Sequence, residues 1–258
     1  MASTSPRSID AVIVGSGMNS LVCAALLGRD GRKVLVLERE SRLGGCIRTD
    51  ELTLPGFRHD TLSTAHPLFL VGPAYAALKD DLHRAGLVYC NTDEPTGVLL
   101  PDGRHLVLST SRERNLQRLG ADGAAFAAAL SEIGAHAPLL FSLLGNELWR
   151  LSTAKTLATA AWKQGPHALA GFFGEAMTPA RAWLEQAFRS DLPGALLAPW
   201  VLHCGLGPDA ALSALMAKVV AFTLEAVGMP MVQGGSANIV RAFEALITKV
   251  GGRWETSA

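Results

Sequence analysis

The hydrophobic pattern is clearest near the N-terminus, where two apolar runs flank a glycine turn. Residues 9–15, IDAVIVG, are rich in β-branched side chains and predict a buried strand. Residues 20–31, SLVCAALLGRDG, predict a helix that ends near Gly31. Residues 33–38, KVLVLE, predict a second buried strand that ends in Glu38. The order of strand, glycine turn, helix and strand predicts the first βαβ unit of a Rossmann-type fold.

The stretch from Ala11 to Gly28 carries no charged side chain, so a membrane-spanning segment is an alternative for this region. A spanning helix needs about 20 consecutive apolar residues, and this run is interrupted by GSGMNS at 15–20. Asp10 precedes the run, without the basic start of a signal peptide. We therefore expect no signal peptide, no transmembrane helix and a cytoplasmic protein, with membrane contact confined to peripheral docking.

A mainly helical domain with one small hairpin is expected over residues 67–228. The hairpin covers 96–109, TGVLLPDGRHLVLS, and turns at PDG. Thr110 begins a T-x-x-E capping box, and Thr178 is expected to cap a later helix whose first residue is a proline. From residue 122 onward the sequence is rich in Ala and Leu. Exposed apolar surface on these helices would indicate a lipophilic substrate tunnel or docking on a membrane surface.

The C-terminal segment returns to an amphipathic pattern. Ser236 is placed to cap a helix that ends at Gly251, and RWETSA, residues 253–258, begins a strand. The apolar residues that recur at helical spacing are Ile239, Val240, Phe243, Leu246, Ile247 and Val250. We expect 1–66 and 229–258 to form the Rossmann-type domain, with residues 67–228 inserted between them.

Composition and charge narrow the classes of function. Hydrophobic residues make up 49% of the chain and charged residues 18%, and the mean hydropathy is +0.25, which leaves a lipid-handling role open. Lys plus Arg equals Asp plus Glu at 23 each, with no basic stripe, so nucleic acid is not an expected partner. The cysteines form no CxxC pair, so neither a metal site nor a redox dithiol is expected. They are Cys23, Cys46, Cys90 and Cys204.

The turn between the first strand and the helix has the chemistry of a dinucleotide site. Gly15 and Gly17 permit a tight turn, and the helix that follows offers free N–H groups to a pyrophosphate. Glu38 ends the second strand, where its carboxylate can accept hydrogen bonds from a ribose. The third glycine of the usual GxGxxG pattern is Ser20 here, which perturbs helix packing without forbidding it. The alternative is a mononucleotide-type or ligand-free Rossmann half.

The residues after Glu38 favour FAD over NAD. ERESRLGGCIRTDEL adds the pair Gly44–Gly45 and resembles the E-x5-GG segment of the glutathione-reductase-type FAD superfamily. Residues 54–69, LPGFRHDTLSTAHPLF, resemble the PGFxxD segment of the phytoene desaturase-like flavoproteins, and MPMVQGGSANIV resembles a later helix of that family. The resemblance covers residues 9–66 and 228–257. It is weak between them.

The resemblance implies an FAD-dependent oxidoreductase of α/β fold that dehydrogenates or isomerises a lipophilic substrate. Hydride transfer to the flavin would be the cofactor's chemistry. No catalytic residue is assigned: His59 and Asp60 are adjacent and would point to opposite faces of a strand, and His66 is a lone histidine. The expected cofactor-binding residues are Gly15, Ser16, Gly17, Met18, Asn19, Ser20, Glu38, Arg39, Arg42, Gly44, Gly45, Cys46 and Arg48.

Chains of this family are longer and return to complete the sheet. We therefore expect an N-terminal portion whose glutathione-reductase-like domain is incomplete. The chain would be either a truncated product or one that a second chain completes. Two alternatives to the flavin dehydrogenase stay open. One is an amine-oxidase-like flavoenzyme, and the other is a non-catalytic partner protein that keeps the Rossmann half.

Overall fold

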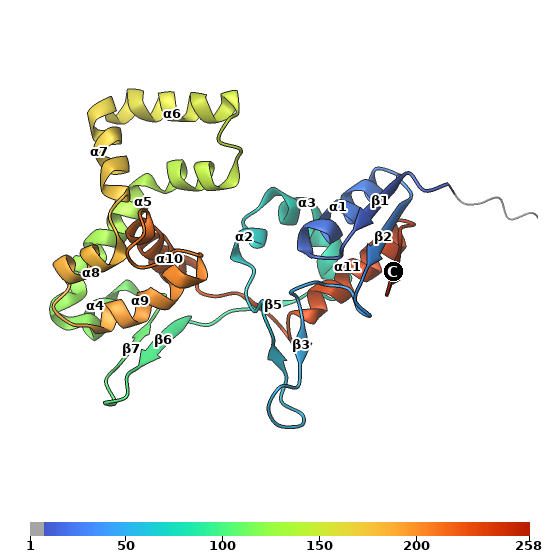
Figure 1. Ribbon diagram of the computed structural model, residues 1–258, viewed down its shortest axis with the longest axis horizontal. Helices are drawn as coiled ribbons and strands as arrows, with labels where there is room; N and C mark the ends of the chain where they lie inside the picture. The colour runs from blue at the N-terminus through green and yellow to red at the C-terminus, as the bar shows by residue number, and fades with distance from the viewer. Residues whose placement is uncertain (1–7) are drawn as a thin grey trace, which may run out of the picture. The chain divides into compact units, whose positions relative to one another are not determined.

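The computed structural model describes residues 8–258, which form two compact units (Figure 1). The first unit consists of the chain up to Asn91 together with Met229–Ala258, and the second unit is Thr92–Gly228. The sequence and the structure place one division at the same point, after Gly228. The sequence places the other division after residue 66. In the structure it falls after Asn91, because the intervening helix packs into the core of the first unit.

A three-stranded parallel sheet forms the centre of the first unit. Its strands are β1 (Ala11–Val14), β2 (Val34–Glu38) and β9 (Arg253–Thr256), in the order β1-β2-β9. In the register of the sheet, Ile13 lies beside Val36, which lies beside Trp254. Two helices, α1 (Met18–Arg29) and α11 (Ala237–Lys249), pack against each other. The predicted N-terminal βαβ unit and the returning C-terminal helix and strand are confirmed.

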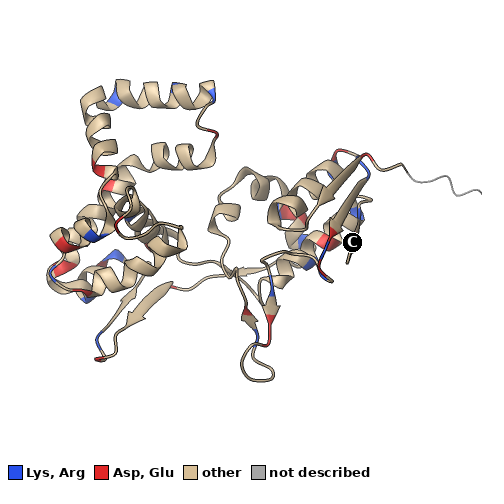
Figure 2. Ribbon diagram, viewed as in Figure 1, with Lys and Arg blue, Asp and Glu red and all other residues tan. Residues whose placement is uncertain are grey.

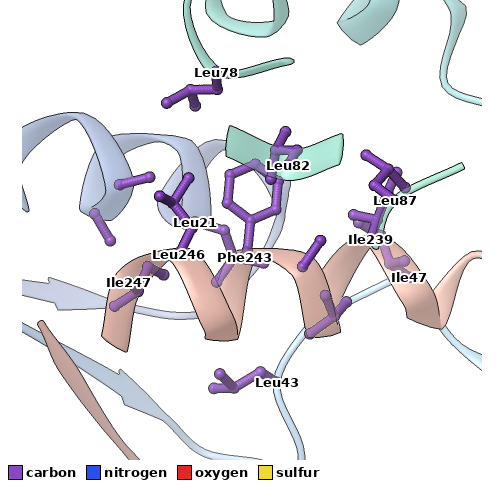
Figure 3. Close-up of a cluster of buried hydrophobic side chains, with 14 of the residues drawn as sticks. Leu21, Leu43, Ile47, Leu78, Leu82, Leu87, Ile239, Phe243, Leu246 and Ile247 are labelled. Atoms are coloured by element: carbon purple, nitrogen blue, oxygen red, sulfur yellow. The ribbon is translucent and has the colours of Figure 1, made fainter. Parts of the chain in front are cut away.

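The core of the first unit lies between α1, α11 and a third helix, α3 (Pro73–Arg84) (Figure 3). Phe243 of α11 is fully buried and points toward Leu82 of α3, with Leu21 of α1 beside it. The ends of α1 and α11 approach so closely that a Cβ atom at Gly28 would lie 2.3 Å from Cγ2 of Val250. Because α3 buries its apolar face here, residues 73–84 belong to the Rossmann-type unit.

Short strands join the loops of the first unit. Three pairs of backbone segments do this: β3 (Thr49–Asp50) with β4 (His59–Asp60), β5 (Tyr89–Cys90) with β8 (Met231–Val232), and Ala65 with Met231. A single helical turn, α2 (Pro67–Leu70), precedes α3. These pairings hold the segment that follows β2 against the start of α11. The candidate site depends on this arrangement.

The second unit is a hairpin followed by helices. The hairpin strands are β6 (Thr96–Leu99) and β7 (His105–Leu108), which pair as the sequence predicts. The helical elements are α4 (Arg112–Leu119), the 3-10 turn η1 (Gly120–Asp122), α5 (Gly123–Gly145), α6 (Leu151–Gln164), α7 (Pro166–Ala176), α8 (Ala180–Ala187), α9 (Leu192–His203) and α10 (Ser213–Val227). Lys218 of α10 is buried beside Glu132, with 2.9 Å between Nζ and the nearer carboxylate oxygen.

Two predicted helix caps are displaced by one residue. Ser111, not Thr110, caps α4, and its hydroxyl accepts a hydrogen bond from the backbone N–H of Arg114 at 3.4 Å. The helix after Pro179 begins at Ala180, whose N–H donates to the Ser213 hydroxyl at 2.6 Å. A side chain from another element therefore satisfies the N–H that Thr178 was expected to bind.

Within residues 8–258, one helical stretch is long and apolar enough to cross a membrane by length and composition. It covers Arg112–Gly145, and 28% of its most apolar window is buried. Its helix α5 packs against α4 and α10, and a core helix of a globular domain passes the same test. A single stretch of this kind is weak evidence for a membrane span.

Candidate dinucleotide-binding site

The glycine turn predicted to hold a pyrophosphate lies between β1 and α1. Gly15 has φ +88°, a conformation that side chains rarely adopt. A Cβ atom at either Gly15 or Gly17 would meet no protein atom within 4 Å, so space is open beside the turn. Gly17 is the N-cap of α1, and this end of the helix has neither a side-chain cap nor an acidic residue in its first turn. The first N–H groups of a helix have no partner within it, which suits this end to an anion.

Glu38 holds this turn from the end of β2. Its carboxylate is buried and accepts hydrogen bonds at Oε2 from the Ser16 backbone N–H, at 2.9 Å, and from the Ser16 hydroxyl. The backbone N–H of Glu40 donates to Oε1 at 2.9 Å. The Glu40 hydrogen bond, followed by that of the Ser16 hydroxyl, lowers the pKa of Glu38 below its usual value, against the opposing effect of burial. Glu38 is therefore an ionised structural clamp, and Oε1 keeps capacity for a further donor.

The second glycine pair lies directly on the first turn. The backbone N–H of Gly44 donates to the Ser16 hydroxyl at 2.9 Å. A Cβ atom at Gly45 would lie 3.3 Å from the Cα atom of Gly17, and Gly45 itself has φ +57°. Gly44 has φ +119°, and a Cβ atom there would lie 2.8 Å from the carbonyl oxygen of Ile47. Residues 44–48 form the second loop, and Ser16 joins it to the glycine turn and to the Glu38 carboxylate in one network.

The remaining predicted contact residues are more dispersed. Arg42 makes a paired hydrogen bond with Asp50, at 2.7 and 2.8 Å. Arg48 donates through Nε to the Gly45 carbonyl at 3.0 Å, which keeps it beside the second loop. Arg39 is 89% exposed in its side chain, and Cys46 and Asn19 are exposed, whereas Met18 and Ser20 are half-buried. The structure therefore brings together the glycines, Ser16, Glu38 and Arg48. The contacts of the other predicted residues stay predictions.

A pocket of about 400 Å³ adjoins the second loop. It opens between that loop, α11 and β9, and it does not include the glycine turn. Three arginines and one acid contribute to its lining, and burial raises the pKa of that acid, Glu244. The lining residues are Ser41, Arg42, Leu43, Ile47, Arg48, Thr49, Ala237, Val240, Arg241, Glu244, Trp254 and Thr256. The excess of cations suits a ligand that carries phosphate.

Asp60 helps to build the site, although the sequence pattern assigns it no role. Its Oδ1 atom accepts hydrogen bonds from the Thr49 hydroxyl at 2.7 Å and from the backbone N–H and hydroxyl of Ser236 at 2.8 and 3.0 Å. The Thr49 hydroxyl in turn accepts from the N–H of Ala237 at 3.0 Å. Ser236 occupies the N-cap position of α11 as predicted, yet its side chain makes no capping bond. The position of Asp60 within the PGFxxD segment was the only signal in the sequence.

Asp60 and its neighbour in β4 point apart. His59 is exposed and lies 2.8 Å from the Thr53 hydroxyl through Nε2, while Asp60 faces α11. The two side chains therefore contact different elements, as alternation along a strand predicts. His66 is half-buried, and burial lowers its pKa. Among residues 8–258 no partner is found for its Nδ1 atom.

Comparison with known proteins agrees with this geometry. The family model of the NAD(P)-binding Rossmann-like domain matches residues 13–85, which contain the end of β1, the glycine turn, β2 and the second loop. One of the subunits of limonene dehydrogenase from Castellaniella defragrans is 34% identical over 113 residues, which are 44% of this chain and 20% of that protein. All-trans-retinol 13,14-reductase of Danio rerio is 53% identical over 49 residues, or 19% of this chain and 8% of that protein.

Solved structures extend the likeness to both units. An oxidoreductase from Methanosarcina mazei matches with a TM-score of 0.55 and 19% identity, over 95% of this chain and 50% of that one. Cyclohexylamine oxidase of Brevibacterium oxydans matches with a TM-score of 0.53 and 16% identity, over 96% of this chain and 51% of that one. The chain therefore shares its fold with these oxidoreductases. The chain spans about half the length of these structures.

Proposed function

We propose that this chain binds FAD and forms part of an oxidoreductase of the phytoene desaturase-like kind, which dehydrogenates or isomerises a lipophilic substrate. The observation that carries the proposal is the second glycine loop seated on the first turn, with Gly45 against Gly17 and Gly44 bound to Ser16. A nicotinamide-binding Rossmann unit does not require such a loop. This arrangement favours FAD among the dinucleotides.

The residues present fit that cofactor. Open space lies beside Gly15 and Gly17, where the pyrophosphate would approach the start of α1. Oε1 of Glu38 is the acceptor proposed for a ribose hydroxyl, and Arg48 holds the second loop closed through the Gly45 carbonyl. When bound, FAD would accept a hydride from the substrate. The chain's own residues would bind the cofactor, orient it and exclude water from it.

The evidence for a lipophilic substrate is of a different kind. Two relatives carry names that specify apolar terpenoid substrates, limonene and retinol. The chain itself has a mean hydropathy of +0.25 and a helical unit rich in Ala and Leu. Each of these relatives matches less than half of this chain, so the transfer of substrate class to it is part of the proposal.

FAD binding is tested with two glycine variants of matched φ angle. Gly15 has φ +88° and Gly103, in the β6–β7 turn, has φ +87°, and a Cβ atom at either position would meet no protein atom within 4 Å. Both Gly15→Ala and Gly103→Ala therefore place a side chain at nearly the same positive φ. We expect the wild-type chain to bind FAD more tightly than NAD⁺, and Gly15→Ala alone to lose at least about tenfold in affinity, or about 1.4 kcal/mol.

Fluorescence titration of FAD measures these affinities. Equal losses in the two variants would show that FAD does not bind at the glycine turn. A preference for NAD⁺ would contradict the assignment of FAD.

The absorbance of the bound flavin tests the substrate class. We expect anaerobic addition of an apolar terpenoid alkene or alcohol to bleach the absorbance of the bound flavin, and a primary amine to leave it unchanged. Bleaching by the amine alone would favour an amine-oxidase-like activity. Bleaching by neither compound would contradict dehydrogenation and leave the FAD site standing, since an isomerisation returns the hydride and leaves the flavin oxidised.

A further inference from the structure

The second unit carries an apolar arm that its own fold leaves uncovered. The arm consists of residues 141–163, which are the end of α5, the connecting loop and most of α6. Figure 1 shows α6 beside the end of α5 and joined to α7. The three most exposed large apolar side chains of residues 8–258 all lie here: Trp149 is 100% exposed, and Leu151 and Trp162 are each 90% exposed. Large exposed apolar side chains gathered in one segment point to a contact site.

The exposed apolar residues of α6 lie on one face. At about 100° per residue, Leu151, Ala158 and Trp162 point within about 40° of one another. All three are exposed. The opposite face, which is turned toward the rest of the unit, contains Thr153, buried, and Thr156, half-buried. A surface helix normally turns its apolar side to the core. This helix turns its largest apolar side chains to the outside.

The three threonine hydroxyls of α6 are satisfied within the arm. The Thr153 hydroxyl donates to the Glu147 carbonyl at 2.7 Å. The hydroxyls of Thr156 and Thr159 donate to the carbonyls of Ser152 and Lys155, at 3.0 and 2.7 Å. Hydroxyls bonded back to the carbonyl four residues earlier need no further partner. The helix can therefore enter an apolar environment without leaving these donors unpaired.

The charges of the arm select the partner. The chain as a whole has a formal net charge of zero. The arm has three cations and a single acid, Glu147, which is paired with Arg150 at 2.8 Å. Lys155 and Lys163 take part in no ion pair within residues 8–258, and Figure 2 shows no acidic residue on α6. Tryptophan and lysine beside an apolar face are the composition of helices that lie in a membrane interface.

We propose that the apolar arm docks on the surface of a lipid bilayer that contains anionic lipids. Leu151 and Trp162 would enter the boundary between headgroups and acyl chains. Lys155 and Lys163 would extend along the same surface to lipid phosphates. The proposal concerns the second unit and does not depend on the cofactor. It also gives a location to the peripheral membrane contact that the composition suggests.

Co-sedimentation with phosphatidylcholine vesicles, with and without phosphatidylserine, tests the proposal. We expect the wild-type chain to partition onto the vesicles that contain phosphatidylserine, and the double variant Leu151→Ser/Trp162→Ser to partition at least about tenfold less. The double variant Lys155→Gln/Lys163→Gln should lose about fivefold for each lysine. The matched control is Leu54→Ser/Phe57→Ser, which removes residues that are 65% and 61% exposed in the first unit. It should bind like the wild type.

Three outcomes would overturn the proposal. The first is no binding of the wild-type chain to either vesicle. The second is an equal loss in the arm variant and in the Leu54→Ser/Phe57→Ser control. The third is self-association in sedimentation velocity that Leu151→Ser/Trp162→Ser abolishes while vesicle binding persists, since the arm would then be an interface between proteins. Circular dichroism of each variant shows whether the fold is retained, as we expect because both exchanged side chains of the arm are almost fully exposed.

Discussion

Two helices of nearly equal length differ in the burial of their apolar residues. α11 buries Ile239, Phe243 and Ile247 completely in the core of the first unit, where α1 and α3 cover them. α6 buries only Thr153 and exposes Leu151 and Trp162. Both helices show an apolar stripe, so periodicity alone does not distinguish them. The stripe predicts that one face of the helix makes a contact. Only the structure shows whether that contact is with the chain's own core.

The largest effect should come from removing one aromatic residue from each helix. Phe243→Ala creates a cavity in the first core and should lower the free energy of unfolding by about 3–5 kcal/mol. Trp162→Ala, whose side chain is 90% exposed, should change it by less than about 0.5 kcal/mol. Urea unfolding followed by circular dichroism measures both. A loss of similar size for Trp162→Ala would mean that the arm is packed in the free chain.

Substitutions at the starts of the two helices should differ less in their effect on the free energy of unfolding. Asp60 accepts three hydrogen bonds where α11 begins, so Asp60→Ala should lower the free energy of unfolding by about 2–3 kcal/mol. At the start of α6, Thr153 makes a single neutral hydrogen bond, so Thr153→Val should cost about 1 kcal/mol. The same unfolding measurement applies. An Asp60→Ala variant as stable as the wild type would remove our explanation of how α11 begins.

The smallest effect concerns two acids of the first unit with opposite pKa shifts. The pKa of Glu38 is lowered from 4.5, so its ionised form stabilises the fold above that pH, and this contribution is lost as the pH falls through the lowered value. Burial raises the pKa of Glu244, on α11, so ionisation of this residue destabilises the fold, and the penalty disappears on acidification. Glu38→Gln should therefore weaken the acid sensitivity of the melting temperature, whereas Glu244→Gln should increase it.

Melting temperatures from neutral pH down to well below 4.5 measure the two slopes. A steeper acid dependence in Glu38→Gln than in the wild type would contradict the role of Glu38 as an ionised clamp.

The sequence predicts much of the first unit because its interactions are local or periodic. The run from β1 through the glycine turn to Glu38 follows from apolar runs and glycine positions. The stripe of α11 follows from its spacing. The contacts of Ser16 could not be predicted, because they depend on Glu38 and Gly44 meeting in space. The cap of α11 was assigned to Ser236, whereas Asp60 and Thr49 supply the hydrogen bonds from distant positions.

The second unit shows a different limit of sequence reasoning. Its helices and hairpin follow from composition and turn residues. The boundary at residue 66 does not hold, because α3 packs on α11 in the core of the first unit. The orientation of α6 is also invisible in the pattern. An apolar stripe has the same spacing whether a core or a membrane covers it, and the exposure of Trp162 is known only from the fold.

The central claim, that the two glycine loops together hold FAD, is tested most directly by hydrogen exchange of the backbone amides with and without FAD. Our account predicts that FAD slows exchange at residues 15–20, around the start of α1, and at residues 44–48, in the second loop. The amides of α6 should be unchanged. FAD binding that leaves both loops unprotected, or that protects only other segments, would contradict the assignment of the site.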